Sequence, residues 1–197
     1  MRTLTYFVAT TLDGFIAGTD GTDPTGSIFT PTQDYLDHMI AHYPETLPVA
    51  ARQALGVTAP RTRFDTILEG RRSYQLGLDA GVTNAYPHLR HLVFSRTLDQ
   101  SPDPAVELVA GDPLEKVRQL KAEDGGSIWL VGGAELAGAL YEEIDELILK
   151  VNPVTLGSGI PLFAGKIDSG LRRFTLIEST VLISGAAFLT YRQELPW

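Results

Sequence analysis

Short apolar runs alternate with longer amphipathic stretches along most of the chain. Runs rich in β-branched and aromatic residues predict strands, whereas apolar residues spaced three and four positions apart predict helices. Strands are predicted at 3–9, 64–70, 91–95, 106–110, 127–133 and 145–154, and two more within the hairpin 174–192. Helices are predicted at 31–43, 71–78, 113–123 and 134–143.

Proline and aspartate mark where two of these helices begin. Pro31 lies near the start of the first, and Asp112 followed by Pro113 forms an N-cap and a first helical position. The stretches 11–27 and 44–63 are rich in glycine or proline and are expected to be loops. Because strands alternate with helices, we predict one α/β domain over 1–197. Its sheet should be mostly parallel, with helices on both faces and an antiparallel C-terminal hairpin.

Composition narrows the classes of function. The formal net charge of −8 argues against a general binder of nucleic acid or of anionic membranes. Five of the twelve arginines nevertheless fall between positions 52 and 72, where they could hold a small anion. The chain has no cysteine, which fits a reducing compartment, and we expect the protein in the cytoplasm. The start of the chain lacks a long apolar core, so neither a signal peptide nor a membrane span is expected.

Polar and glycine residues follow three of the predicted strands. In parallel sheets, ligands bind beyond the carboxyl ends of the strands. Here those ends run into Gly70-Arg71-Arg72-Ser73, Ser95-Arg96 and Gly132-Gly133. Glycine allows a phosphate close to the backbone, and guanidinium groups bind it by charge-assisted hydrogen bonds. Each turn alone could be only a tight turn, but together they predict a phosphorylated ligand. The three-glycine dinucleotide fingerprint is absent after the first strand, which disfavours an ordinary Rossmann domain.

The same residues carry a resemblance to a known family. The matching stretches are TLDGFIAG (11–18), DTILEGRRSY (65–74), HLVFSR (91–96), IWLVGGAELAGAL (128–140) and DELILKVNPVTLGSGIPLF (145–163). In this order, over nearly the whole chain, they resemble the dihydrofolate reductase superfamily, and within it the branch that contains the reductase (RibD C-terminal) domain of riboflavin biosynthesis. The resemblance implies a dihydrofolate-reductase-like sheet of about eight strands, NADPH as hydride donor and a homodimer.

The resemblance also implies which residues contact the cofactor. The phosphates, including the 2′-phosphate, fall to Gly70, Arg71, Arg72, Ser73, Ser95 and Arg96. The pyrophosphate falls to Gly132, Gly133, Ala134, Glu135 and Leu136. The nicotinamide is expected to lie between the backbone at Ala9 and the loop around Ile16.

The substrate side departs from the family pattern. Dihydrofolate reductases carry one acidic residue on the first helix, and here both Asp34 and Asp37 are candidates for the catalytic acid. Asp13 is a third, although a structural turn is the favoured interpretation for it. Riboflavin-branch reductases carry a substrate-binding glutamate shortly before the glycine turn, where this chain has Val131. We expect Val131 in the substrate wall, together with Tyr35 and Met39, whose spacing of four also suits a helix face in the core.

The sequence therefore predicts an NADPH-dependent oxidoreductase that reduces a heterocyclic or small carbonyl compound, similar to 5-amino-6-(5-phosphoribosylamino)uracil reductase. Alternatives are a true dihydrofolate reductase and a non-catalytic nucleotide-binding protein with the same fold. A metal-binding protein is a further alternative, because Asp34, His38 and His42 share one helix face. A polar helix face is the favoured interpretation of that trio, so no metal is expected.

Overall fold

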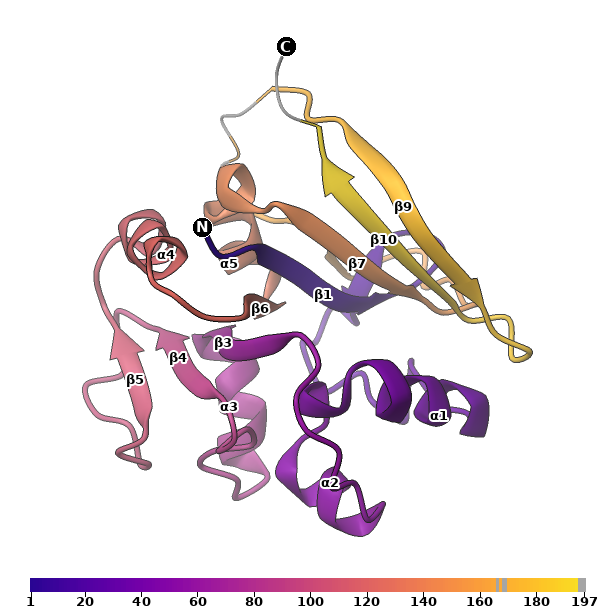
Figure 1. Ribbon diagram of the computed structural model, residues 1–197, viewed down its shortest axis with the longest axis horizontal. Coiled ribbons are helices and arrows are strands. Elements are labelled where there is room, and N and C mark those ends of the chain that lie inside the picture. Colours follow the sequence, from indigo (N-terminus) through magenta and orange to yellow (C-terminus); the bar gives the residue numbers. More distant parts are fainter. Residues whose placement is uncertain (166, 168–169, 195–197) are drawn as a thin grey trace.

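Eight strands form one mixed sheet in the order β5-β4-β3-β6-β1-β7-β10-β9 (Figure 1). The computed structural model describes residues 1–165, 167 and 170–194. The strands are β1 (Leu4–Thr10), β3 (Phe64–Gly70), β4 (Arg90–Phe94), β5 (Val106–Val109), β6 (Ser127–Gly132), β7 (Glu146–Val151), β9 (Phe174–Val181) and β10 (Ala187–Gln193). From β5 to β7 in that order, all neighbouring strands are parallel to each other. The strand β10 is antiparallel to both of its neighbours, β7 and β9. The predicted parallel sheet with an antiparallel closing hairpin is confirmed.

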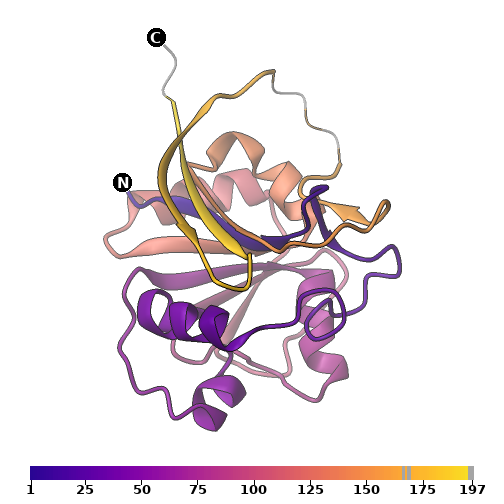
Figure 2. The same cartoon turned by 90° about the vertical axis from the view of Figure 1, so that its right-hand side faces the viewer.

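Helices cover both faces of this sheet, as predicted. They are α1 (Gln33–His42), α2 (Val49–Ala54), α3 (Arg71–Asp79), α4 (Pro113–Ala122) and α5 (Ala134–Ala139). Figures 1 and 2 show α1, α2 and α3 on one side of the sheet and α4 and α5 on the other. Asp112 caps α4 as predicted, because its carboxylate accepts from the backbone N–H of Leu114 at 2.9 Å. No helix in the described part of the chain is long and apolar enough to cross a bilayer.

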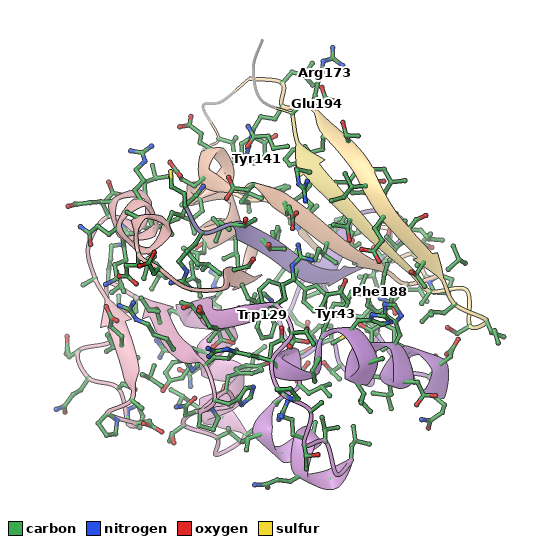
Figure 3. The ribbon with its side chains drawn as sticks, viewed as in Figure 1. Tyr43, Trp129, Tyr141, Arg173, Phe188 and Glu194 are labelled. Atoms are coloured by element: carbon green, nitrogen blue, oxygen red, sulfur yellow. The ribbon has the colours of Figure 1, made fainter. Side chains whose placement is uncertain are left out.

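Each face of the sheet buries its own apolar cluster. Leu68, Leu120, Ile128 and Leu140 are fully buried in the cluster packed against α4 and α5. On the opposite face an aromatic cluster around Phe7 packs against α1. Figure 3 shows Tyr43, Trp129 and Phe188 of this cluster gathered between the sheet and α1. Burying one such side chain stabilises the fold by roughly 1.5–3 kcal/mol, so the two clusters fix α1 and α5 relative to the strand ends.

Two parts of the chain differ from the predicted loops. Residues 44–63 contain a 3-10 helix, η1 (Pro44–Thr46), and α2, and they are fastened by the fully buried Glu45. The carboxylate of Glu45 accepts backbone hydrogen bonds from Thr62, Arg63 and Phe64 at 2.8–3.1 Å.

The second difference is a small separate sheet, in which β2 (Phe15–Ala17) pairs with β8 (Ile160–Pro161). A Cβ on Gly159 would lie 2.4 Å from the carbonyl oxygen of Ala17, so glycine allows this close approach. Strands of two or three residues are too short to show a periodic pattern, which is why the sequence did not predict them.

Candidate functional site

The carboxyl ends of β3, β4 and β6 lie side by side. In register, Gly70 pairs with Phe94 and Glu69 pairs with Gly132, so Ser95 follows directly beside Gly70. A Cβ added to Gly70 would lie 3.3 Å from the backbone nitrogen of Gly133. The three strand ends therefore converge at one edge of the sheet.

The backbone of the double-glycine turn is open toward the strand-end edge. Gly132 has a φ of +137°, a conformation that favours glycine, and the peptide bond between Gly132 and Gly133 is cis. A Cβ built on either glycine would meet no heavy atom closer than the Ser73 hydroxyl oxygen, at 3.8–4.0 Å. A ligand atom can therefore approach this backbone from the side where other residues carry a Cβ.

One arginine at this edge has an unmet hydrogen-bond donor. The Nη1 of Arg71 is buried and has no partner among the described residues. A buried donor left unpaired costs about 1–3 kcal/mol, which an acceptor such as a phosphate oxygen would offset. Arg72 is well exposed and lies 3.8 Å from the carboxylate of Glu135, a surface pair of little strength.

Ser95 and Arg96 have different roles at the end of β4. Ser95 is buried, and its hydroxyl oxygen accepts from the backbone N–H groups of Thr97 and Leu98 at 3.2 and 2.9 Å. This arrangement fixes the turn after β4. Arg96 is exposed within that turn, so its guanidinium is accessible to a ligand at the same edge.

The remaining predicted cofactor residues contribute backbone and apolar surface. Ala134 is buried and its carbonyl accepts from Ala164 N–H at 2.9 Å, while Leu136 is buried beside Gly70. Ala9 is half-buried near the end of β1. Ile16 lies in β2 and packs against the cluster beneath α4 and α5.

Among the acidic candidates, Asp13 is engaged by the backbone of another loop. Its carboxylate accepts from the Thr11 hydroxyl at 2.6 Å, from Gly157 N–H at 2.7 Å and from Leu156 N–H at 3.0 Å. These hydrogen bonds, that from Thr11 foremost, lower the pKa of Asp13 below its usual value. Asp13 is therefore ionised and ties two loops together, as the structural interpretation expected.

Asp34 is also engaged. Its carboxylate accepts from the hydroxyl of Thr32, and from the backbone N–H groups of Tyr35 and Ser184 at 2.9 Å. These bonds, led by that from Thr32, lower the pKa of Asp34 to about 2. Asp37 is exposed on the same helix and accepts from the side-chain amide of Gln33 at 2.8 Å. Asp34 is therefore ionised and held by three hydrogen bonds, whereas Asp37 lies exposed on α1.

Of the residues predicted to contact the substrate, two pack in the core and one lines a cavity. Met39 is only 4% exposed and packs within the aromatic cluster, and Val131 is half-buried against the same cluster. Tyr35 packs on Phe188 with ring centroids 5.2 Å apart, and burial raises its pKa. Tyr35 also lines a cavity of about 150 Å³ between α1 and the ends of β7 and β10, to which Asn152 and Ala186 contribute. Of the three residues expected in the substrate wall, only Tyr35 lines this cavity.

His38 and His42 stack on each other rather than surround an ion. Their ring centroids lie 4.4 Å apart, and His38 packs on Phe188 at 4.3 Å. Burial, with a smaller contribution from His42, lowers the pKa of His38. Within the described ranges no group of three or more His, Asp or Glu side chains is arranged to hold a metal ion.

A larger cavity, of about 310 Å³, lies at the opposite, amino edge of the sheet. Its charged side chains all form ion pairs: Lys121 with Asp145 at 2.9 Å, Arg192 with Glu146 at 3.0 Å, and Arg2 with Asp65 outside the cavity. Because these charges are satisfied, this cavity offers no free group for chemistry.

One residue near the substrate region was not indicated by the sequence pattern. Lys150 pairs in register with Ala9 of β1 and with Phe188 of β10, so its side chain emerges on the face that α1 covers. A single lysine within the apolar run of β7 fits an ordinary strand pattern, and only the pairing of three strands reveals what surrounds it.

Comparison with known proteins supports the fold that this geometry builds. A family model described as the RibD C-terminal domain matches residues 2–188. The uncharacterized protein YwjB of Bacillus subtilis (strain 168) is 31% identical over 164 residues, which cover 82% of this chain and 83% of YwjB. The uncharacterized protein YyaP of the same organism is 29% identical over an alignment of 204 residues, covering 96% and 94% of the two chains.

Solved structures share the fold over nearly the whole chain. A protein from Shewanella sp. PV-4, described as a "Putative riboflavin biosynthesis protein", superposes with a TM-score of 0.67 at 23% identity, covering 99% of this chain and all of that one. The dihydrofolate reductase of Enterococcus faecalis, solved with NADP(H), superposes with a TM-score of 0.61 at 16% identity, covering 97% and 96%. The expected dihydrofolate-reductase-like fold is confirmed.

Proposed function

Since the chain belongs to the family of RibD C-terminal domains, we propose that it is an NADPH-dependent reductase that transfers a hydride to a heterocyclic or small carbonyl compound. NADPH would supply the hydride, and the protein would orient the acceptor against the nicotinamide and exclude water. The proposal extends to this chain what the resemblance implies for its family.

The observation that carries the proposal is the unmet donor of Arg71 at the same edge as the open double-glycine turn. The buried Nη1 of Arg71, the open backbone of Gly132-Gly133 and the exposed guanidinium of Arg96 lie along one edge. This set fits a ligand with several phosphate groups. Arg72 and Ser73 would complete the phosphate contacts, and Ala9 and Ile16 would flank the nicotinamide.

The acceptor is less restricted than the cofactor. Val131 stands where riboflavin-branch reductases carry a glutamate, so the substrate need not be the riboflavin precursor. The acceptor region that we propose is the cavity beside Tyr35, which opens between α1 and the ends of β7 and β10.

The test is NADPH binding by calorimetry, followed by NADPH oxidation assayed separately with dihydrofolate, with 5-amino-6-(5-phosphoribosylamino)uracil and with isatin, a flat heterocyclic ketone. Oxidation with dihydrofolate alone would favour a true dihydrofolate reductase. Tight binding without oxidation by any acceptor would favour the non-catalytic alternative. No NADPH binding at millimolar concentration would overturn the proposal.

We also propose that two copies of the chain associate through β9. This strand is one of the two edges of the sheet, and Leu176, Ile177 and Val181 on it are 45–73% exposed. Exposed apolar edge strands are usually covered or paired. Light scattering at micromolar concentration tests this proposal.

A further inference from the structure

Lys150 stands apart from the other described lysines by its surroundings. Lys116 lies 2.5 Å from the carboxylate of Glu107, and Lys121 lies 2.9 Å from that of Asp145. The ammonium group of Lys150 forms no ion pair and no hydrogen bond within the described residues. It lies instead over the ring of Phe7, 4.2 Å from the ring centroid.

This ammonium group lies on the face of the sheet that α1 covers, in a half-buried position. Phe7 packs on Tyr43 at 4.7 Å, and Phe188, the cross-strand partner of Lys150, packs on Tyr35 and Tyr43. A lysine on a surface normally extends its ammonium into water and covers apolar surface with its methylenes. Lys150 is half-buried, and its ammonium group lies over the aromatic ring of Phe7 instead.

The cation–π contact with Phe7 does not satisfy the hydrogen-bond donors of the ammonium group. Such contacts contribute favourably, yet an ammonium carries three N–H donors that seek oxygen acceptors. Burial lowers the pKa of Lys150 to about 8, and no neighbouring carboxylate opposes this effect. At neutral pH the group is therefore mainly protonated and able to release its proton.

The position of Lys150 relates it to the proposed hydride transfer. Ala9, its partner in β1, is where the nicotinamide is expected. Asn152, two residues further along the chain and just past the end of β7, lines the cavity beside Tyr35. The carboxylates that the sequence offered as acids are engaged elsewhere or exposed on the outer side of α1. The acceptor would still need a proton.

We propose that Lys150 donates a hydrogen bond and then a proton to the carbonyl oxygen of a flat, aromatic or heterocyclic acceptor. The inference rests on the proposed NADPH-dependent function. As the carbonyl carbon accepts a hydride from NADPH and the C=O π bond breaks, the oxygen takes a proton from Nζ of Lys150. The products are the alcohol, NADP⁺ and a neutral amine, which regains its proton from water. The ring of Tyr35, which lines the proposed acceptor cavity, favours a flat acceptor.

Other titratable groups lie on the elements around Lys150. Tyr35, His38 and Tyr43 come from α1 and its C-terminus, and Glu178 comes from β9. None of them forms a hydrogen bond or ion pair with Lys150 in the part of the chain that the structure describes. Burial raises the pKa of both tyrosines, which makes them weaker acids.

The first experiment needs neither cofactor nor substrate. The sequence has four lysines, at 116, 121, 150 and 166, so nitrogen-15 NMR can follow each side-chain amine. One signal, absent in Lys150→Met and present in Lys116→Met, should titrate near pH 8. If the signal assigned to Lys150 titrates at the ordinary lysine pKa of about 10.4, the proton-donor role is overturned even where NADPH binds.

The second experiment separates proton donation from simple attraction. With NADPH and isatin, Lys150→Met should lower kcat by roughly 10²–10⁴-fold, the usual contribution of a positioned acid, while NADPH affinity stays unchanged. Lys150→Arg keeps the charge but cannot release its proton near neutral pH, so it should retain the KM and lose kcat. The wild-type rate should fall above about pH 8, whereas the matched control Lys116→Met should keep both rate and pH profile.

Each other result decides against the inference. If Lys150→Arg keeps the full kcat, Lys150 only attracts the acceptor. If Lys150→Met is fully active and Asp37→Asn is inactive, the carboxylate on α1 is the acid. If NADPH binds but the wild type reduces none of the three acceptors, the non-catalytic alternative holds and the chain has no proton donor. Failure to bind NADPH would remove the proposed function itself, together with this inference.

Discussion

The nearest heavy atom to a Cβ built on Gly133 is the hydroxyl oxygen of Ser73, 3.8 Å away on α3. Gly133 itself has a φ of −78° and a ψ of −172°, which any residue can adopt. The glycine is therefore required neither by packing nor by backbone conformation within the described fold. A ligand that approaches the backbone at this point gives a physical reason for it.

Gly133→Ala should leave the melting temperature nearly unchanged and weaken NADPH. The methyl group would occupy space where we propose that a phosphate contacts the backbone. Loss of one charge-assisted hydrogen bond costs about 1.5–3 kcal/mol, so the Kd should rise at least roughly tenfold. Calorimetric titration beside thermal unfolding measures both quantities, and unchanged affinity would show that no phosphate contacts this turn.

Arg96→Ala should weaken NADPH more than NADH, because only NADPH carries the 2′-phosphate. A guanidinium–phosphate contact of about 1.5–3 kcal/mol predicts roughly a ten- to hundredfold loss for NADPH. Arg61→Ala, which changes an exposed arginine outside the strand ends, is the matched control. An equal loss for both cofactors would assign Arg96 to another part of the ligand.

Gly138→Ala should destabilise the protein, although alanine normally stabilises a helix relative to glycine by about 0.8–1.0 kcal/mol. A Cβ on Gly138 would lie 1.8 Å from the carbonyl oxygen of Ala164, so either α5 or the loop that contains Ala164 must move. Such overpacking costs about 1–3 kcal/mol or more. Gly111→Ala meets no atom within 4 Å and serves as the control in urea unfolding. A stabilised Gly138→Ala would mean that this loop does not pack on α5.

Asp34 should make the stability of the fold decrease at acidic pH. Its pKa in the folded protein, about 2, lies below the usual 3.8. Its contribution is thus fully present above about pH 4 and is lost as the pH falls toward 2. The difference in melting temperature between the wild type and Asp34→Asn should shrink over that window, while Asp37→Asn should change the melting temperature little at pH 7. A difference that is constant from pH 6 to pH 3 would contradict the hydrogen bonds to Ser184 and Tyr35.

The residues at the strand ends could be predicted because the pattern is local: glycine and arginine directly follow an apolar run in the sequence. Gly70, Ser95 and Gly132 each follow a strand, and parallel pairing then brings them together. Lys150 was not predictable in this way. Its isolation from carboxylates depends on Phe7 in one strand and Phe188 in another, which are far apart in sequence. The engagement of Asp34 likewise depends on Ser184, in a turn 150 residues away.

The last prediction concerns β9, an edge strand of the sheet. In β9, side chains on both faces are exposed, Val181 to 73%, and Ile183 in the following turn is fully exposed. An apolar edge of this kind favours pairing with a second copy, which would cover both the side chains and the unpaired backbone groups. Light scattering at micromolar concentration should give the mass of two chains. Val181→Lys places a charge at that edge and should shift the mass to that of one chain. Arg61→Ala, which changes an exposed residue away from β9, should remain a dimer. A single-chain mass for the wild type would mean that β9 is exposed in solution and that the edge has another role.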